Sequence, residues 1–156
     1  MHHTTADLER LARSGDWAGV LACVVGRLGA DSGTLHIIEA DNQLHLVAST
    51  GIPPGVVELV RLVPIGKGMA GLAVERRELV DACNIQTDTS GDVRPGARAT
   101  GLQGSIVVPL MHGADALGAL GVANRAERTF SVDEQQDLLD LGRRIAALIA
   151  TGPRPA

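Results

Sequence analysis

The residues most able to do chemistry lie in and around a polar stretch at positions 84–104. Asp88, Arg94 and Arg98 place both signs of charge there, and a planar guanidinium can hold a carboxylate or phosphate through two hydrogen bonds. Lys67 precedes an expected helix, whose N-terminal N–H groups favour an anion. We therefore predict ligand contacts by these four residues; the alternative is that they are only solvated.

Cys83 offers a thiol just before the same stretch. A partly exposed cysteine near arginines ionises and oxidises readily, which gives a redox-sensor hypothesis for Cys83. The alternative is a buried small hydrophobe, which is our interpretation of Cys23. Two cysteines without metal-ligand spacing predict no disulfide framework and favour a reducing compartment.

Two histidines and one glycine-rich segment resemble binding motifs. His36 and His45 lie on adjacent expected strands, and with Cys83 they suggest a metal or haem site. No third ligand stands at a suitable spacing, so we interpret both as surface histidines and predict no metal. Residues 66–71 fit the G-x-G-x-x-G pattern, but dinucleotide binding requires a preceding strand. Because Pro64 argues against that strand, we predict a tight loop.

Periodicity predicts helices and strands in a definite order. Helical patterns cover residues 8–12, 17–28, 56–60 and 72–74, and a terminal helix begins at a Ser131–Glu134 capping box and ends at Gly152. Strand patterns cover residues 34–39, 43–49, 78–81, 105–111 and 116–124. Antiparallel hairpins with helices at both ends predict an α+β fold in which the terminal helices cover one face of the sheet.

Three segments resemble the GAF domains of bacterial sensors and cyclic-nucleotide phosphodiesterases, in the family's order. They are VPIGKGMAG at 63–71, SIVVPL at 105–110, and LGALGV at 117–122 followed by Asn124-Arg125 and Phe130 to Glu134. The resemblance runs from Asp7 to Ala150 and implies one domain over residues 1–156, with its core at about 7–150.

The resemblance also implies a GAF/PAS-like antiparallel sheet of about five to six strands. The terminal helices pack on one face, and a pocket lies on the other, under residues 53–74 and 81–101. Ser105 and Cys83 fall where family pockets present polar groups, so both are predicted ligand contacts. Arg125 replaces the lysine of the nucleotide-binding pattern, and one residue fewer separates Phe130 from Asp133. Both departures weaken a cyclic-nucleotide prediction.

Composition excludes several classes of protein. Hydrophobic residues make up 45% and charged residues 21% of 156 residues, which is typical of a globular domain. The formal net charge is −4, basic residues are scattered, and Trp17 and Phe130 are the only aromatic residues, so we predict no nucleic-acid partner. The sequence lacks a signal peptide and an apolar run of roughly 20 residues, so we predict a cytoplasmic protein without a membrane partner.

The leading functional prediction is a sensor domain that binds a small molecule and regulates a separate chain, without a required cofactor. We predict that the domain is not an enzyme, because free methionine sulfoxide reductases of this fold use a cysteine where this chain has Arg98 to Gly101. Because no effector segment follows Ala156, we expect the signal to pass to a separate chain or a homodimer. Two alternatives stay open: redox sensing at Cys83, and a ligand-free domain that dimerises through the terminal helix. The residues of that dimer would be Leu138, Leu141, Ile145 and Leu148.

Overall fold

The computed structural model describes residues 5–93 and 95–152. The elements in chain order are α1 (Thr5–Arg13), α2 (Trp17–Arg27), β1 (Ser32–Ile38), β2 (Gln43–Thr50), α3 (Pro54–Val60), β3 (Leu62–Pro64), α4 (Gly68–Arg76), β4 (Val80–Ala82), the 3-10 helix η1 (Pro95–Thr100), β5 (Ser105–His112), β6 (Asp115–Ala123) and α5 (Val132–Thr151). No helix within these residues combines the length and the apolar character that crossing a bilayer requires.

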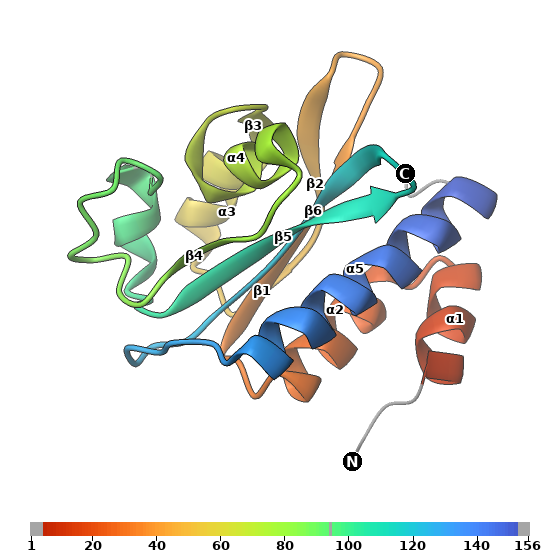
Figure 1. Ribbon diagram of the computed structural model, residues 1–156, viewed down its shortest axis with the longest axis horizontal. Coiled ribbons are helices and arrows are strands. Elements are labelled where there is room, and N and C mark those ends of the chain that lie inside the picture. Colours follow the sequence, from red (N-terminus) through yellow and green to blue (C-terminus); the bar gives the residue numbers. More distant parts are fainter. Residues whose placement is uncertain (1–4, 94, 153–156) are drawn as a thin grey trace.

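The six strands form one antiparallel sheet in the order β3-β2-β1-β6-β5-β4. Helices α1, α2 and α5 lie on one side of this sheet, whereas α3, α4 and the segment between β4 and β5 lie on the other (Figure 1). We call these sides the helix face and the cavity face. The predicted α+β architecture is confirmed.

Local sequence signals set the ends of the two long helices. Asp16 caps α2, because its side chain accepts a hydrogen bond of 2.9 Å from the N–H of Gly19. Ser131 and Glu134 form the predicted capping box of α5, with each side chain accepting from the other residue's N–H. These caps satisfy amides that the first turn of a helix leaves without partners.

The main hydrophobic core lies on the helix face. Its fully buried side chains come from both the helices and the three central strands: Val20, Leu21, Val24, Leu35, Ile37, Ile106, Leu110, Leu120, Leu138 and Ile145. Successive residues of a strand point to opposite faces, so the residues between these, such as His36 and Gly121, belong to the cavity face.

The terminal helix does not leave its apolar stripe free. Leu138, Leu141 and Ile145 are buried in the core, and Leu148 packs against it. The predicted dimer through these four residues is therefore wrong, because the same atoms already cover the chain's own sheet. The outward side of α5 instead carries exposed polar residues, including Gln136, Asp140 and Arg143.

The prediction that no strand precedes residues 66–71 is also wrong. Leu62 to Pro64 form β3, which pairs with β2 at one edge of the sheet. An edge strand tolerates proline, because its outer side needs no hydrogen-bond donor. The glycines nevertheless follow an antiparallel edge strand, so they are not in the βαβ context of a dinucleotide site. Gly71 lies in α4 where an added Cβ would come within 2.4 Å of the Pro64 carbonyl oxygen.

Candidate functional site

A cavity of about 320 Å³ lies on the cavity face of the sheet. Strands β1, β5 and β6 form its floor, and α3, α4, η1 and the adjoining loop form its walls. Apolar side chains make up most of the lining: Ile52, Val56, Leu59, Val60, Val63, Met69, Ala70, Ile85, Ala97, Leu102, Val107 and Ala123. This is the location that the sequence resemblance implies for a pocket.

Small residues on β6 leave room for the cavity. Ala119, Gly121 and Ala123 alternate along the cavity face of this central strand. A Cβ added to Gly121 would lie 3.2 Å from both Thr34 Oγ1 and Val107 Cγ2, so even a methyl group crowds the floor here. The opposite face of the same strand carries Leu120 and Val122 in the dense core. The cavity therefore follows from the choice of side chains on one face.

His36 is the buried titratable group of the cavity wall. It is 2% exposed, and its Nε2 lies 2.8 Å from the carbonyl oxygen of Val60, at the end of α3. Nδ1 has no hydrogen-bond partner among the described residues. Burial lowers the pKa of His36, against the opposing effect of the hydrogen bond to Val60. A buried hydrogen-bond acceptor without a donor lowers the stability of the fold by about 1–3 kcal/mol.

The interpretation of His36 as a surface residue is wrong. Its neighbours Leu35 and Ile37 face the helices, so His36 points to the cavity face, where α3 covers it. His45 pairs with Ile37 in the β1–β2 ladder and so lies on the opposite face from His36. It is partly exposed and contacts Asp41 over 2.8 Å. The two histidines therefore do not share a metal site.

Two of the predicted ligand contacts line the cavity. Ser105 is 8% exposed at the start of β5, and Lys67 is exposed immediately before α4. Both positions were named from the sequence, Ser105 through the family resemblance and Lys67 through its place before a helix. The sequence interpretation missed His36 and the apolar residues of α3. Alternation along β1 was the available signal for His36.

The predicted charged residues of the polar stretch contact each other instead of the cavity. Arg98 donates to the carbonyl oxygens of Ile85 and Asp88, over 3.4 and 3.0 Å. The Asp88 carboxylate accepts from the N–H and the hydroxyl of Ser90. Neither Asp88 nor Arg98 is among the described residues that line the cavity. Arg94 lies outside the described residues. The charges at 88 and 98 order the loop, and their role as ligand contacts stays a prediction.

Cys83 is exposed and does not belong to the described lining of the cavity. Its carbonyl oxygen accepts a hydrogen bond of 3.1 Å from the Arg128 N–H. Cys23 is buried in α2 on the helix face, as predicted, and burial raises the pKa of its thiol. The redox hypothesis for Cys83 stays untested.

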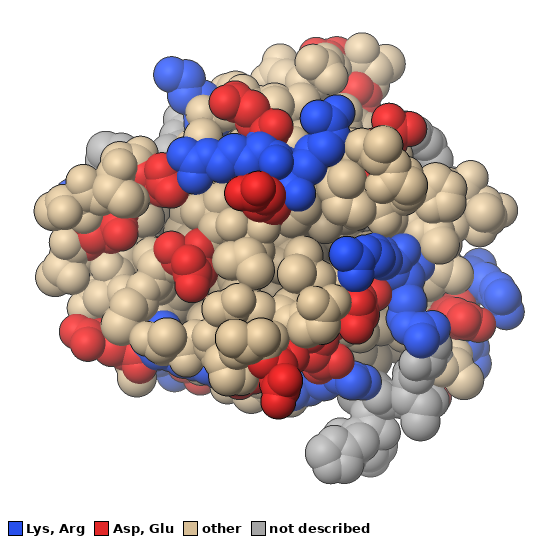
Figure 2. Space-filling view, viewed as in Figure 1, with Lys and Arg blue, Asp and Glu red and all other residues tan. Residues whose placement is uncertain are grey.

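Charged side chains of both signs are interspersed on the face of the molecule shown in Figure 2. Several form ion pairs, and the pair between Arg76 and Asp92 is bidentate, with distances of 3.0 and 3.2 Å. This pair joins α4 to the loop that walls the cavity. Because the pair is exposed, solvent screens it and it contributes little to stability.

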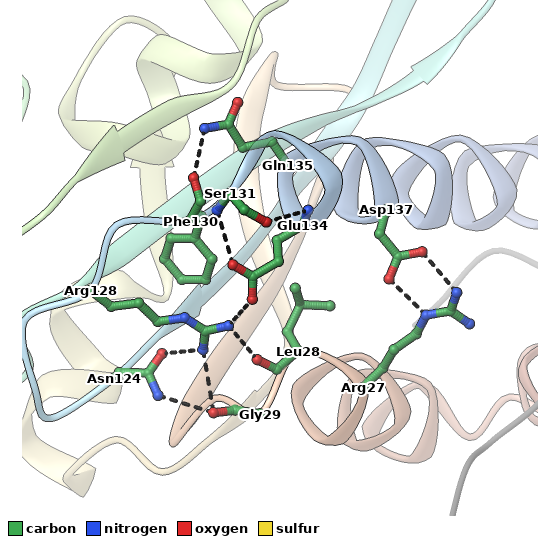
Figure 3. Close-up of polar contacts among 10 residues, drawn as sticks. All are labelled: Arg27, Leu28, Gly29, Asn124, Arg128, Phe130, Ser131, Glu134, Gln135 and Asp137. Carbon is green, nitrogen blue, oxygen red and sulfur yellow. Dashed lines mark hydrogen bonds and ion pairs between the residues drawn. The ribbon is translucent and has the colours of Figure 1, made fainter.

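Arg128 forms a polar junction where β6 leads into α5 (Figure 3). Its guanidinium donates to the carbonyl oxygens of Leu28 and Gly29 at the end of α2, and to Oδ1 of Asn124, over 2.7, 3.3 and 2.8 Å. It also pairs with the Glu134 carboxylate, and its plane lies 4.3 Å from the centre of the Phe130 ring. One side chain thus joins the C-terminal end of α2 to the N-terminal end of α5.

Glu134 has two roles at this junction. It accepts from the Ser131 N–H and pairs with Arg128, and these two hydrogen bonds lower the pKa of its carboxyl group. Asn124 follows β6, and its side chain donates a hydrogen bond of 3.1 Å to the Gly29 carbonyl oxygen. Asn124, Phe130 and Glu134 of the family-like segment therefore have structural roles here.

Backbone hydrogen bonds connect this junction to the cavity loop. The Gln103 N–H donates to the Asn124 carbonyl oxygen, and the Asn124 N–H donates to Gly104, each over 2.8 Å. The Arg128 N–H reaches the Cys83 carbonyl at the other end of the loop. Both ends of the loop that walls the cavity are thus bonded to the segment that carries Arg128.

A model of the GAF domain family matches residues 19–150 of the chain. No curated protein matches the sequence.

Solved structures share the fold along nearly the whole chain. The GAF domain of an Acinetobacter phosphoenolpyruvate-protein phosphotransferase is 22% identical, with a TM-score of 0.73 over 96% of this chain and 95% of that one. A free methionine-R-sulfoxide reductase from Neisseria meningitidis, in complex with its substrate, is 18% identical, with a TM-score of 0.74 over 94% and 86%. A domain of a Sinorhizobium meliloti protein described as a two-component sensor histidine kinase is 15% identical, with a TM-score of 0.69 over 91% and 90%. At these identities the likeness shows the fold alone.

Proposed function

Because the chain belongs to the GAF domain family, we propose that it is a sensor domain that binds a small molecule and thereby regulates a separate signalling protein. The observation that carries this proposal is the cavity of about 320 Å³ on the cavity face. Ligand pockets are typically apolar hollows of roughly 300–1,000 Å³ with a few polar groups. The cavity is at the lower end of this range and has that composition.

The contacts around the cavity offer a route for the signal. A ligand that orders the loop at residues 83–104 acts on the backbone hydrogen bonds at both ends of that loop. These bonds lead to Arg128, whose side chain holds the ends of α2 and α5 together. A ligand shifts such an arrangement only if it binds one state more tightly than another. We place the output at the ends of these two helices.

We also propose that the domain is not an enzyme. Some proteins of the same fold are reductases of free methionine sulfoxide, for example those from Neisseria meningitidis and Staphylococcus aureus. Sulfoxide reduction by a thiol requires a cysteine beside the substrate. Both cysteines of this chain are described, and neither lines the cavity. Incubation with free methionine sulfoxide and a thiol reductant is expected to yield no methionine.

A partner protein and a cytoplasmic location complete the proposal. Two free cysteines suit a reducing compartment. Any homodimer through the terminal helices would use their polar outward sides, because the apolar stripe of α5 is already buried. The alternative of a ligand-free interaction domain would leave the cavity without a function.

Native mass spectrometry of the protein purified from cells tests the proposal. The wild type is expected to retain a small molecule that Ala70→Phe, which fills the cavity wall on α4, does not retain. Ala22→Phe adds the same ring to the exposed side of α2 and is the matched control. Thermal unfolding establishes that both variants fold. If the folded wild type carries no ligand and no member of a metabolite panel raises its Tm, the interaction-domain alternative replaces the sensor proposal.

A further inference from the structure

The hydrogen bond between His36 and Val60 determines which ring nitrogen carries the proton. A carbonyl oxygen only accepts, so Nε2, at 2.8 Å from the Val60 oxygen, is the donor. Burial lowers the pKa of His36, so the ring is neutral at pH 7 and Nδ1 is an acceptor with a free lone pair. Repulsion by His45 also lowers this pKa, and Lys67 is the charged residue among the described residues that line the same cavity.

The lone pair of Nδ1 is buried without a partner. Less than 1 Å² of this atom is accessible, so bulk water does not satisfy it, and no described residue donates to it. Buried polar groups almost always have a partner, and an exception calls for an explanation. His36 lines the cavity, but protein atoms cover Nδ1, so a molecule bound there reaches this atom only by displacing the groups that cover it.

The lining beside His36 offers a charged ligand no partner. Lys67, which is exposed to solvent before α4, is the one charged residue among the described residues that line the cavity, and it is the group there that would favour an anion. A cationic ligand would find no carboxylate among these residues, and an anionic oxygen at Nδ1 would be repelled by its lone pair. Most of the remaining wall is aliphatic, with the hydroxyl groups of Ser32, Thr34, Thr100 and Ser105 as its other polar side chains.

We propose that the cavity takes an uncharged, mainly apolar molecule with an O–H or N–H group that donates a hydrogen bond to Nδ1 of His36. This inference rests on the proposed function, because it names the ligand class of the same cavity. The donor reaches Nδ1 once the ligand has displaced the groups that now cover this atom. Nε2 keeps its hydrogen bond to Val60, so the ligand contacts a side chain that is already tied to the end of α3.

Matched probes that differ in one hydrogen-bond donor test this inference. The pairs are 2-naphthol with 2-methoxynaphthalene, and indole with 1-methylindole; 2-naphthoate adds a charge to the first framework. Titrations followed by two-dimensional NMR are expected to show shifts in cavity residues, with the donor of each pair bound about tenfold more tightly than its methylated partner. 2-Naphthoate is expected to bind more weakly than 2-naphthol.

Two variants separate the acceptor from the structural tie. His36→Gln places a donor near the position of Nε2 but no acceptor at the position of Nδ1, so the preference for donors is expected to fall to about one. His36→Asn places an acceptor near Nδ1 and loses the tie to Val60, so it is expected to be less stable and to keep the preference. Thermal unfolding shows that each variant is folded.

Three results would overturn the inference: no binding of any probe, equal binding within both pairs, or tighter binding of the naphthoate. A donor preference that persists in His36→Gln would also overturn it. A charged molecule retained from cells in the native mass spectrum would overturn this ligand class while leaving the sensor proposal in place. An empty cavity in that spectrum, together with no thermal shift, would remove both.

Discussion

The two faces of the sheet differ although the same strands build both. On the helix face, Leu35, Leu120 and Ile106 meet α2 and α5 in a core with fully buried side chains. On the cavity face, Gly121 and Ala123 leave a cavity of about 320 Å³, with an unsatisfied histidine nitrogen in its wall. The helix face is therefore densely packed, whereas the smaller clusters of the cavity face leave a volume open.

The largest expected contrast is between equally buried leucines on the two faces. Leu138→Ala on the helix face is expected to lower the free energy of unfolding by about 3–5 kcal/mol, because the dense core cannot collapse around the lost atoms. Leu102→Ala beside the cavity is expected to cost about 1–3 kcal/mol, because one side of Leu102 already faces empty space. Urea denaturation of both variants measures the difference. Equal losses would mean that the cavity face is packed as tightly as the helix face.

Substitution of Arg128 tests whether the polar junction helps to hold α2 and α5 together, in addition to the apolar core. Arg128→Met keeps an unbranched stem beside Phe130 but removes the side-chain donor of the Leu28 carbonyl oxygen and one of the two side-chain donors of the Gly29 carbonyl oxygen, so a loss of about 1–3 kcal/mol is expected. Arg27→Met breaks only the exposed pair with Asp137 and is expected to cost about 1 kcal/mol or less. Denaturation midpoints compare the two. A loss at position 27 equal to that at position 128 would contradict the junction.

His36 gives the smallest predicted effect, and it depends on pH. Because burial lowers its pKa in the folded chain, the unfolded chain binds the proton more readily below about pH 6.5. The stability from the neutral ring is therefore complete above that pH and decreases as the pH falls, by at most about 1.4 kcal/mol per pH unit.

The matched variants for this pH effect are His36→Gln and His112→Gln, the latter exposed at the end of β5. Urea denaturation between pH 5 and pH 8, a range chosen to span roughly the unfolded pKa of histidine, is expected to give a shallower slope for His36→Gln only. An unchanged slope in that variant would show that His36 does not supply this pH dependence.

The features that the sequence predicted correctly are those that local chemistry decides. The capping box at Ser131, the antiparallel hairpins and the 3.6-residue spacing of α2 depend on contacts within a few residues. The glycine-rich segment and the strand segments, which follow the order of the family, were sufficient to predict the fold class. Lys67 was named from its position before a helix and Ser105 from the family resemblance, and both line the cavity.

Tertiary contacts decided the remainder. His36 is buried because α3 covers its face of the sheet, and Pro64 lies in a strand because β3 has only one partner. Asp88 and Arg98 contact the loop itself, because backbone carbonyl oxygens of the loop accept the hydrogen bonds of the Arg98 guanidinium. The residues of this chain determine their own caps, turns and periodicity, but which side of a strand is covered, and by what, depends on segments far away in the sequence, so only the packed chain reveals it.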